Sequence, residues 1–445
     1  MQAWFHDVVN YLCDLLGADQ RFTCRVTGED SDMVRFNGGR IRQAGSVTQR
    51  ELALQLIEGD RQVRGTLELT GDIAADRFPL RQLHDALSTL VREAPPDPHL
   101  CFPDAVSTTE DREDDRLPPT SAVLPLILAE QRDLQPVGIY MAGRIAEGVA
   151  TSSGLRRWYE THTFDLDLSL CLGLGPRERD RSVKLTLGGT RWDPAEVERQ
   201  LATAAAKAER LRADRVRVAP GAYRTYIAPS GWKMILRTLG WRGAFSHRAV
   251  ANGTSPFAAL HRGERLSTRV SISENHSLGW TAPFSPDGFR RRLELPLVEE
   301  GRVSSVCVAP RTALEYGVPH TGATAEENPG SIEVAAGDLP LAEIPERIGD
   351  GLYLDHLHYL NLSDRGTASV TGLTRFAAFR VRDGRIAEPL EIVRFDDSVL
   401  QLLGERLIGL TAERERLPEG RSYHRRALGG ALLPGAIVEG LRIVS

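Results

Sequence analysis

Two histidines separated by one residue, His356 and His358, form the best local candidate for a metal site in this 445-residue sequence. Alternate residues of a β-strand point to the same face, so both imidazole rings could reach one ion. His320 and His276 are candidates for a third ligand, but no spacing fixes either of them. The alternative is that these histidines are polar residues on a surface that faces solvent or a groove.

Metal-dependent hydrolysis needs more than two histidines. A zinc peptidase requires ligands one helical turn apart and a carboxylate that activates the metal-bound water. The chain contains neither H-E-x-x-H nor H-E-x-x-x-H at any position. Serine hydrolase chemistry is also disfavoured, because no G-x-S-x-G motif surrounds Ser246, which precedes His247.

A second group of candidate residues, Gly372, Thr374 and Arg375, lies in the strand-like run 370–375. A glycine inside a strand often marks a bulge or a place where another backbone comes close. A planar guanidinium is suited to a peptide carboxylate or carbonyl. The segment 351–403 is therefore predicted to be a sheet that binds an extended peptide. The alternative for its charged residues Arg375, Arg394 and Asp396 is an internal salt bridge, such as Arg394 with Asp396 or Asp397.

Local patterns predict the elements that would position these residues. Asp383-Gly384, flanked by apolar strand-like residues, is a strong signal for a hairpin turn. A helix is expected to begin after this sheet, with Asp396 or Asp397 as its N-cap.

The N-terminal part of the chain predicts helices packed on a sheet. Apolar residues in 4–16 recur at i, i+3, i+4 and i+7, which is typical of an amphipathic helix, and a second helix is expected from Pro79 to Glu93. Asn37-Gly38 is typical of a tight hairpin. Strands are expected over 22–26, 33–36, 40–44, 51–57 and 63–69.

Residues 95–119 interrupt this pattern. They are rich in proline and acidic residues, which favours an exposed linker or a long loop. Beyond them, a helix is expected from Thr120 or Ser121 to Arg132. Another is expected over 194–212, because Asp193 is a good N-cap and a proline follows it.

The second half of the chain is dominated by short strands and Gly/Pro turns, which favours a mostly antiparallel twisted sheet or open barrel. The expected fold class is α+β, with N-terminal helix–sheet layers followed by a β-rich C-terminal domain. The expected division is 1–94 for an N-terminal α+β domain, 95–119 for the linker, 120–213 for a second α+β segment of the N-terminal half, and 214–445 for the C-terminal domain.

Composition excludes several classes of protein. The formal net charge is −5, so a nucleic-acid binder, which usually shows a basic excess, is not expected. No run approaches the roughly 20 apolar residues of a membrane span. The five cysteines are far apart in the sequence, which suits a reducing compartment. A secretory leader is not expected either, because the first residues lack a basic region. We therefore expect a cytoplasmic protein.

Several short motifs, taken in order, resemble the TldD/PmbA family, a group of bacterial and archaeal proteins that includes a zinc metallopeptidase. The similarity covers nearly the whole chain. Its markers are Met33 to Ile41 (MVRFNGGRI), Ser285 to Gly288 (SPDG), Pro319 to Gly322 (PHTG), the GLYL strand from Gly351, Thr371 to Arg375 (TGLTR), Val381 to Ile386 (VRDGRI), Val393 to Ser398 (VRFDDS) and Val438 to Leu441 (VEGL).

The resemblance implies that a zinc-bearing subunit carries H-E-x-x-x-H on one helix and a cysteine near its C-terminus. The matching helix here, 228–237, contains no histidine and no glutamate, but it does contain Lys233 and Arg237. No cysteine follows Cys307. The chain is therefore similar to the TldE (PmbA) type of subunit, which lacks its own zinc.

For a subunit of this type, the resemblance implies a heterodimer with a TldD-like zinc subunit and a cleft that admits unfolded peptides. No cofactor is expected in this chain, and zinc is expected in the partner. Gly372, Thr374, Arg375, His320, His356 and His358 are the candidate peptide-binding residues. Aromatic residues of the C-terminal half, Trp241, Phe245, Phe257 and Trp280, are expected at the subunit interface.

Two other functions stay open at this point. The chain could be a self-sufficient metalloenzyme with a non-standard site at His356, His358 and His320. It could also be a homodimeric protein that binds extended peptides without catalysis. A neighbouring gene that encodes a chain with H-E-x-x-x-H would favour the heterodimer over both other functions. Metal analysis of the purified single chain would separate the other two functions.

Overall fold

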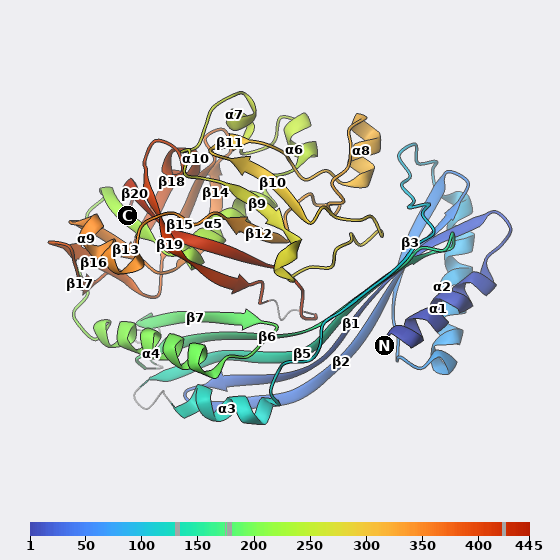
Figure 1. Cartoon of the computed structure of the whole chain (residues 1–445), viewed down its shortest axis with the longest axis horizontal. Helices are drawn as coiled ribbons and strands as arrows, with labels where there is room; N and C mark the ends of the chain where they lie inside the picture. The colour runs from blue at the N-terminus through green and yellow to red at the C-terminus, as the bar shows by residue number, and fades with distance from the viewer. Residues whose placement is uncertain (130–133, 174, 176–179, 421–423) are drawn as a thin grey trace.

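A computed structural model describes residues 1–129, 134–173, 175, 180–420 and 424–445 of the protein. Its strands form two sheets, one of seven strands in the N-terminal half and one of thirteen in the C-terminal half (Figure 1). Neither sheet closes into a barrel, and most strand pairs are antiparallel. The expected α+β class, with helix–sheet layers followed by a β-rich region, is confirmed.

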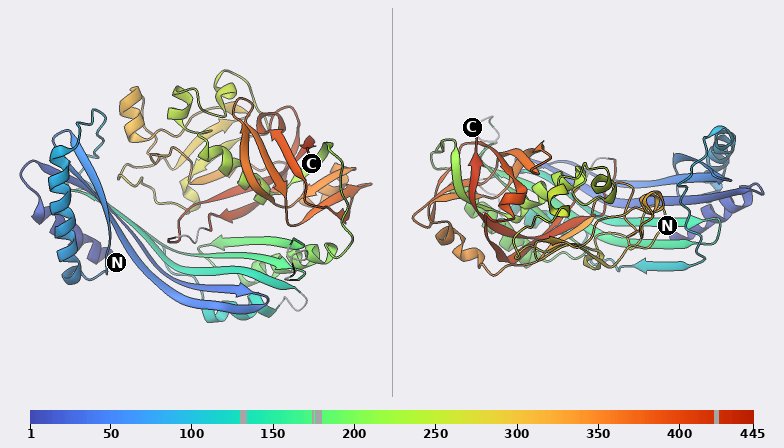
Figure 2. Two further views of the ribbon diagram at one scale, coloured as in Figure 1. Left: turned by 180° about the vertical axis from the view of Figure 1, so that it is seen from behind. Right: turned by 90° about the horizontal axis from the view of Figure 1, so that it is seen from above.

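The N-terminal sheet is built from long, curved strands that bend around the C-terminal half (Figure 2). Its order is β3-β2-β1-β5-β6-β4, with β7 also paired to β6. The strands are β1 (Gln20–Asn37), β2 (Arg40–Glu58), β3 (Arg61–Glu68), β4 (Thr108–Arg112), β5 (Gln135–Thr151), β6 (Arg156–Cys171) and β7 (Ser182–Gly189).

Strands β1 and β2 are each continuous, so the predicted breaks at residues 27–32 and 45–50 were wrong. The polar middle of β1 stays in the sheet because its side chains have partners there, and Glu29 and Ser31 are buried. A hairpin joins the two strands as predicted, but its turn lies one residue later than the predicted Asn37-Gly38, because Asn37 still pairs with Arg40. Its two turn residues are Gly38 and Gly39, with φ of 64° and 70°, a left-handed conformation that glycine adopts without strain.

Helices α1 (Gln2–Leu15) and α2 (Ile73–Glu93) pack on one end of this sheet (Figure 1). The predicted start of α2 at Pro79 was six residues late, because Asp72 caps the helix by accepting a hydrogen bond from the Ala74 amide. Helix α4 (Pro194–Arg210) begins where expected, since Asp193 accepts from the Glu196 amide. Helix α3 (Thr120–Ala129) also begins as expected, but its predicted end at Arg132 lies outside the described residues.

The stretch 95–119, expected to be a linker or a long loop, is in part a strand. Residues Thr108–Arg112 form β4, which pairs in parallel with β6 at the edge of the sheet. The same sheet continues across the expected boundary, because β1 pairs with β5 over fourteen residues, from Thr23 to Phe36. The segments 1–94 and 120–213 therefore share one sheet.

The C-terminal sheet has the main order β11-β10-β9-β12-β20-β8-β13-β16-β17, and β14, β15, β18 and β19 attach beside it. Its strands are β8 (Gly221–Ile227), β9 (Ile272–Asn275), β10 (Glu294–Glu299), β11 (Arg302–Val303), β12 (Ser331–Val334), β13 (Gly351–Leu354), β14 (Leu357–Asp364), β15 (Ser369–Thr374), β16 (Ala378–Arg382), β17 (Arg385–Pro389), β18 (Arg394–Ser398), β19 (Leu407–Pro418) and β20 (Gly430–Ile443).

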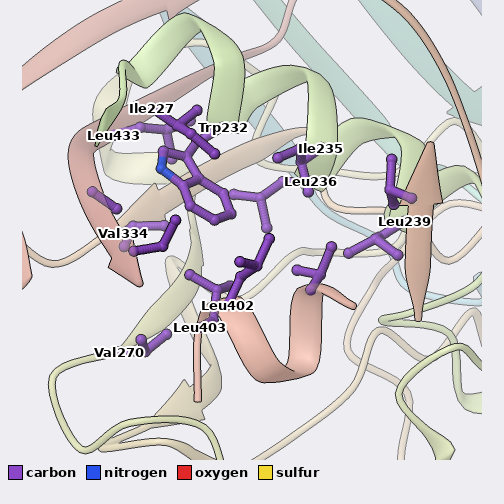
Figure 3. Packing of buried hydrophobic residues seen from close by; sticks show 14 of the residues in the cluster. Ile227, Trp232, Ile235, Leu236, Leu239, Val270, Val334, Leu402, Leu403 and Leu433 are labelled. Carbon is purple, nitrogen blue, oxygen red and sulfur yellow. The ribbon is translucent and has the colours of Figure 1, made fainter. Parts of the chain in front are cut away.

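Helix α5 (Pro229–Trp241) is the buried centre of this half. One face of the helix, formed by Trp232, Ile235, Leu236 and Leu239, packs on apolar residues from distant segments (Figure 3). The partners shown are Val270, Val334, Leu402, Leu403 and Leu433. This packing fixes the rotation of the helix, so its remaining face is turned away from this core.

The remaining helices are short: α6 (His247–Ala251), α7 (Ala258–His261), α8 (Pro310–Tyr316), α9 (Ile344–Ile348) and α10 (Val399–Leu402). The predicted N-cap of α10 was wrong. Ser398 caps it by accepting from the Gln401 amide, while Asp397 instead pairs with Arg406. The Asp383-Gly384 hairpin is confirmed, with both turn residues at positive φ. No helix of the described residues is long and apolar enough to cross a membrane.

Candidate functional site

A cavity of about 500 Å³ lies between the N-terminal sheet and α5. Strands β1 and β5 contribute one wall, and α5 contributes the other. Segments 281–286, 324–332 and 425–431 complete the lining. Because α5 uses its other face for the core, it presents here, besides Leu236, the residues Lys233, Arg237 and Trp241, spaced one helical turn apart.

Arg237 and Trp241 form the rim of this cavity. The Arg237 guanidinium carbon lies 4.2 Å from the centre of the Trp241 ring, which is cation–π geometry. The same guanidinium is 3.7 Å from a Glu419 carboxylate oxygen. The Trp241 side chain is 57% exposed although it is large and apolar. The rim therefore offers a flat aromatic surface beside a cation.

Lys233 lies deeper in the same wall. Its Nζ donates a hydrogen bond to the Pro418 carbonyl oxygen, at the end of β19. Burial lowers the pKa of the Lys233 ammonium, and the nearby Glu419 only partly offsets this. This lysine is thus a half-buried cation whose hydrogen-bond acceptor is neutral.

Arg426 connects the strands that form the opposite wall of the cavity. It is 3% exposed, and its guanidinium donates to Asp165, Thr163 and Ser31 on neighbouring strands. Its backbone amide donates to Glu29. These contacts explain the buried polar middle of β1, and they make Arg426 a structural residue.

Arg291 also lines the cavity, although the run Arg290 to Arg292 looked like a solvated basic face in the sequence. Arg290 and Arg292 are exposed, whereas Arg291 is half-buried between them. Its Nε is buried and has no hydrogen-bond acceptor among the described residues.

A zinc ion does not fit this face of α5. Zinc binds to thiolate, imidazole and carboxylate groups, whereas Lys233 and Arg237 carry positive charges that repel a cation. In the parts of the chain that the structure describes, no group of three or more His, Cys, Asp or Glu side chains is arranged to hold a metal ion.

His356 and His358 do come close together, around the ring of Phe376. Their ring centres lie 5.2 Å and 6.3 Å from it, and Arg375 also contacts this ring. Burial, aided by Lys184 and by the other histidine, lowers the pKa of His356 to about 3. Burial and Arg375 lower the pKa of His358 as well. Both rings are therefore neutral at physiological pH.

The other histidines do not join this pair. His320 is exposed and packs edge-on against Phe289, with ring centres 5.3 Å apart. His276 is buried, where its Nδ1 is 2.5 Å from the Thr281 hydroxyl and its Nε2 is 3.5 Å from Glu274. The predicted alternative site of His356, His358 and His320 is therefore not assembled among the described residues.

Gly372 and Thr374 have structural surroundings, which corrects their predicted place in a peptide groove. Strand β15 is paired on both edges, with β14 and with β18, so no edge is left for an added strand. A Cβ at Gly372 would lie 2.8 Å from the ring of Phe395. Thr374 is buried, and its hydroxyl accepts a hydrogen bond from the Val393 amide.

Arg375 is partly exposed at the end of β15. Its guanidinium is 3.6 Å from an Asp180 carboxylate oxygen, and both side chains are about one-third exposed. Two bulky residues next to this group, Tyr359 and Phe376, have φ of 58° and 66°, which is strained for aromatic side chains. The expected pair of Arg394 with Asp396 or Asp397 is not among the ion pairs of the described residues, where Arg442 pairs with Asp396 and Arg406 with Asp397.

A second cavity, of about 640 Å³, lies between β7 and α4 on one side and β19 on the other. Lys207 pairs there with Asp355 at 2.5 Å. The attraction of Asp355 and Tyr353 raises the pKa of Lys207, although burial opposes it. The Glu415 side chain is exposed to this cavity. Even so, the surrounding protein partly removes its carboxylate from water, and this desolvation, together with the negative charge of Asp355, raises its pKa to about 7.

Comparison with known proteins places these features in a family. Residues 220–445 match the PmbA/TldA metallopeptidase C-terminal domain. A curated protein of Methanothermobacter thermautotrophicus, named a metalloprotease, is 27% identical over 197 residues, which is 39% of this chain. The match spans only 42% of that relative's own length.

Solved structures extend the similarity to the whole fold. TldE from Thermococcus kodakarensis is 14% identical, with a TM-score of 0.76 over 99% of this chain and 100% of that one. A candidate modulator of DNA gyrase from Thermotoga maritima is 13% identical, with a TM-score of 0.77 over the same shares. A similar candidate modulator from Bacteroides thetaiotaomicron is 12% identical, with a TM-score of 0.75 over 100% of this chain and 98% of that one. The family match covers half of the chain, and we conclude that the protein belongs to the TldD/PmbA family of metallopeptidase-like proteins.

Proposed function

We propose that this protein is the zinc-free subunit of a TldD–TldE-type metalloprotease complex that cleaves or trims unfolded peptides. The observation that carries the proposal is the cavity face of α5. In the family pattern this helix bears the metal ligands of the zinc subunit, whereas here it presents Lys233 and Arg237. The chain would form one wall of the peptide channel, and a TldD-like partner would supply the zinc and the catalytic carboxylate.

The open cleft suits an extended peptide. Its walls combine apolar and charged side chains, and its volume of about 500 Å³ falls in the range of ligand pockets, roughly 300–1,000 Å³. Trp241 lies exposed at the rim and could contact a peptide or the partner subunit. By contrast, Phe245, Phe257 and Trp280 are buried in the chain's own core, which corrects their expected place at an interface.

Co-expression with a chain that carries H-E-x-x-x-H tests this function. We expect a stable heterodimer with about one zinc ion per pair and cleavage of an unstructured peptide. Replacing the glutamate of the partner's motif by glutamine is expected to abolish cleavage, whereas Arg237→Gln in this chain is expected to leave the zinc content unchanged. Peptide cleavage by this chain alone, with bound zinc, would instead support a self-sufficient metalloenzyme.

A homodimeric peptide-binding protein without catalysis is the remaining alternative. It predicts that the chain forms no complex with a zinc-bearing relative at micromolar concentration. Affinity capture of a tagged zinc-bearing chain distinguishes the two outcomes, because only a heterodimer retains this chain on the resin.

A further inference from the structure

We propose that the cavity beside α5 binds a carboxylate of an unfolded peptide, with Lys233 and Arg291 as the residues that hold it. The inference rests on the proposed function, since it specifies the chemistry by which the peptide is bound. It does not require this chain to hold a metal ion.

The first argument is the contrast between Lys233 and the other two lysines of the chain. Lys184 pairs with Asp167, and Lys207 pairs with Asp355. The Lys233 ammonium has the Pro418 carbonyl as its acceptor, and no carboxylate of the described residues forms an ion pair with it. The charge of nearby Glu419 offsets the cost of burying the Lys233 ammonium only in part, so a bound anion would be favourable here.

The second argument is the unused donor capacity of Arg291. Its backbone amide bonds to the Pro283 carbonyl at 3.0 Å. The Nε of its guanidinium is buried and has no hydrogen-bond acceptor within the described parts of the chain. A guanidinium offers several N–H donors in a planar fork that matches the two oxygens of a carboxylate.

The third argument is the balance of charge in the lining. Six basic residues line the cavity, and four of them have acidic partners: Arg25 with Glu147, Arg237 with Glu419, Arg425 with Glu51, and Arg426 with Asp165. Lys233 and Arg291 are the two that remain. Glu326, the other acidic residue of the lining, is exposed. Neither of these two side chains forms an ion pair at contact distance with a carboxylate of the described residues, although the charge of buried Glu274 acts on Arg291 and that of Glu419 acts on Lys233. They are therefore the two cations of the lining with the most to gain from a bound anion.

The carboxylate could belong to the C-terminus of a peptide or to an Asp or Glu side chain. Half-buried apolar residues of the same lining, including Pro286, Ile332 and Leu428, would contact the rest of the peptide. Trp241 at the rim would contact the peptide where it leaves the cavity. The site would thus select unfolded chains by charge at one point, with little sequence preference elsewhere.

Fluorescence anisotropy with N-terminally labelled unstructured hexapeptides tests the inference on the full chain. The arms are a free C-terminus, a C-terminal amide, an amide with one internal Asp, and the same amide with Asn. We expect at least one carboxylate peptide to bind about tenfold or more tightly than its neutral counterpart. The arm that shows this preference identifies the source of the carboxylate.

Substitution assigns the preference to the two residues. Lys233→Met and Arg291→Gln are each expected to remove about tenfold of the affinity for the carboxylate peptide and to leave the amide peptide unaffected. Lys233→Arg is expected to retain part of the preference. Arg262→Gln, at an exposed arginine outside the cavity, is the matched control.

Equal binding of carboxylate and amide peptides would overturn the inference, as would variants that keep the full preference. A measurement on the unaltered chain does not depend on how the variants fold: the carboxylate peptide is expected to protect Lys233 from acylation, and the amide peptide is not. Assembly with a zinc-bearing partner is measured separately. A chain that assembles but ignores the carboxylate contradicts only this inference, whereas one that binds the carboxylate but does not assemble contradicts only the proposed function.

Discussion

The ring of Phe395 in β18 lies against the backbone of Gly372 in β15. The two residues are paired across the strands, and a Cβ at position 372 would lie 2.8 Å from the Phe395 ring and 3.1 Å from Leu360. The glycine therefore makes room for an aromatic side chain of the same sheet. Its role is to allow packing, which leads to the first prediction.

Gly372→Val is expected to lower the free energy of unfolding by about 1–3 kcal/mol, because overpacking forces the Phe395 ring to move. Urea titration followed by tryptophan fluorescence measures this change. Gly45→Val is a useful comparison, since a Cβ there meets nothing within 4 Å. A Gly372→Val protein with unchanged stability but weakened peptide binding would restore the groove interpretation.

Arg375 is expected to influence the titration of His358. The pKa of His358 is lowered by burial and then by the positive charge of Arg375. Removing this charge favours the protonated imidazole, so Arg375→Ala is expected to raise the pKa of His358 towards its ordinary value. Histidine-selective NMR titration reads this directly, and Arg262→Ala, at an exposed arginine, should leave the pKa of His358 unchanged.

Glu415 is expected to make the protein less stable as the pH rises. Its pKa is raised to about 7 in the folded protein, above the usual value near 4.3. The folded state therefore binds this proton more tightly, and the stabilisation, fully present below pH 4, is lost as the pH rises through 7. Urea midpoints of Glu415→Gln are expected to vary less between pH 4.5 and 7.5. Glu405→Gln, at an exposed glutamate, should keep the original pH dependence.

The isolated chain is expected to hold no stoichiometric zinc after mild dialysis. The reason is the positive charge of Lys233 and Arg237 on α5, and of Lys184 and Arg375 near the histidine pair. Elemental analysis measures the zinc content. About one zinc ion per chain, lost in the double variant His356→Ala/His358→Ala, would contradict the prediction.

Lys233 is expected to react with amine-directed acylating reagents faster than Lys207 at pH 8. Acylation consumes the neutral amine. Burial lowers the pKa of Lys233, whereas Asp355 and Tyr353 raise that of Lys207 despite its burial. Because the chain has three lysines, peptide mapping by mass spectrometry resolves each site. A slower rate at Lys233 would show that its amine is not accessible from the cavity.

The sequence by itself determined the elements that depend on local chemistry. Asp383-Gly384 formed the predicted hairpin, and Asp193 capped the predicted helix, because turns and caps are decided by residues within about one helical turn of each other. The absence of H-E-x-x-x-H could likewise be read without a structure. The order of short motifs was sufficient to identify the family.

Only the tertiary structure decided what these elements contact. The polar middle of β1 looked like a break until Arg426, almost 400 positions later, was found to bind its buried side chains. Arg291 looked like one of three solvated arginines, and Gly372 looked like an opening for a peptide. Their roles depend on distant segments of the chain. The Phe395 ring fills the space that a Cβ at position 372 would need, and the buried Nε of Arg291 has no hydrogen-bond acceptor among the described residues. The neighbouring residues in the sequence carry no information about these surroundings.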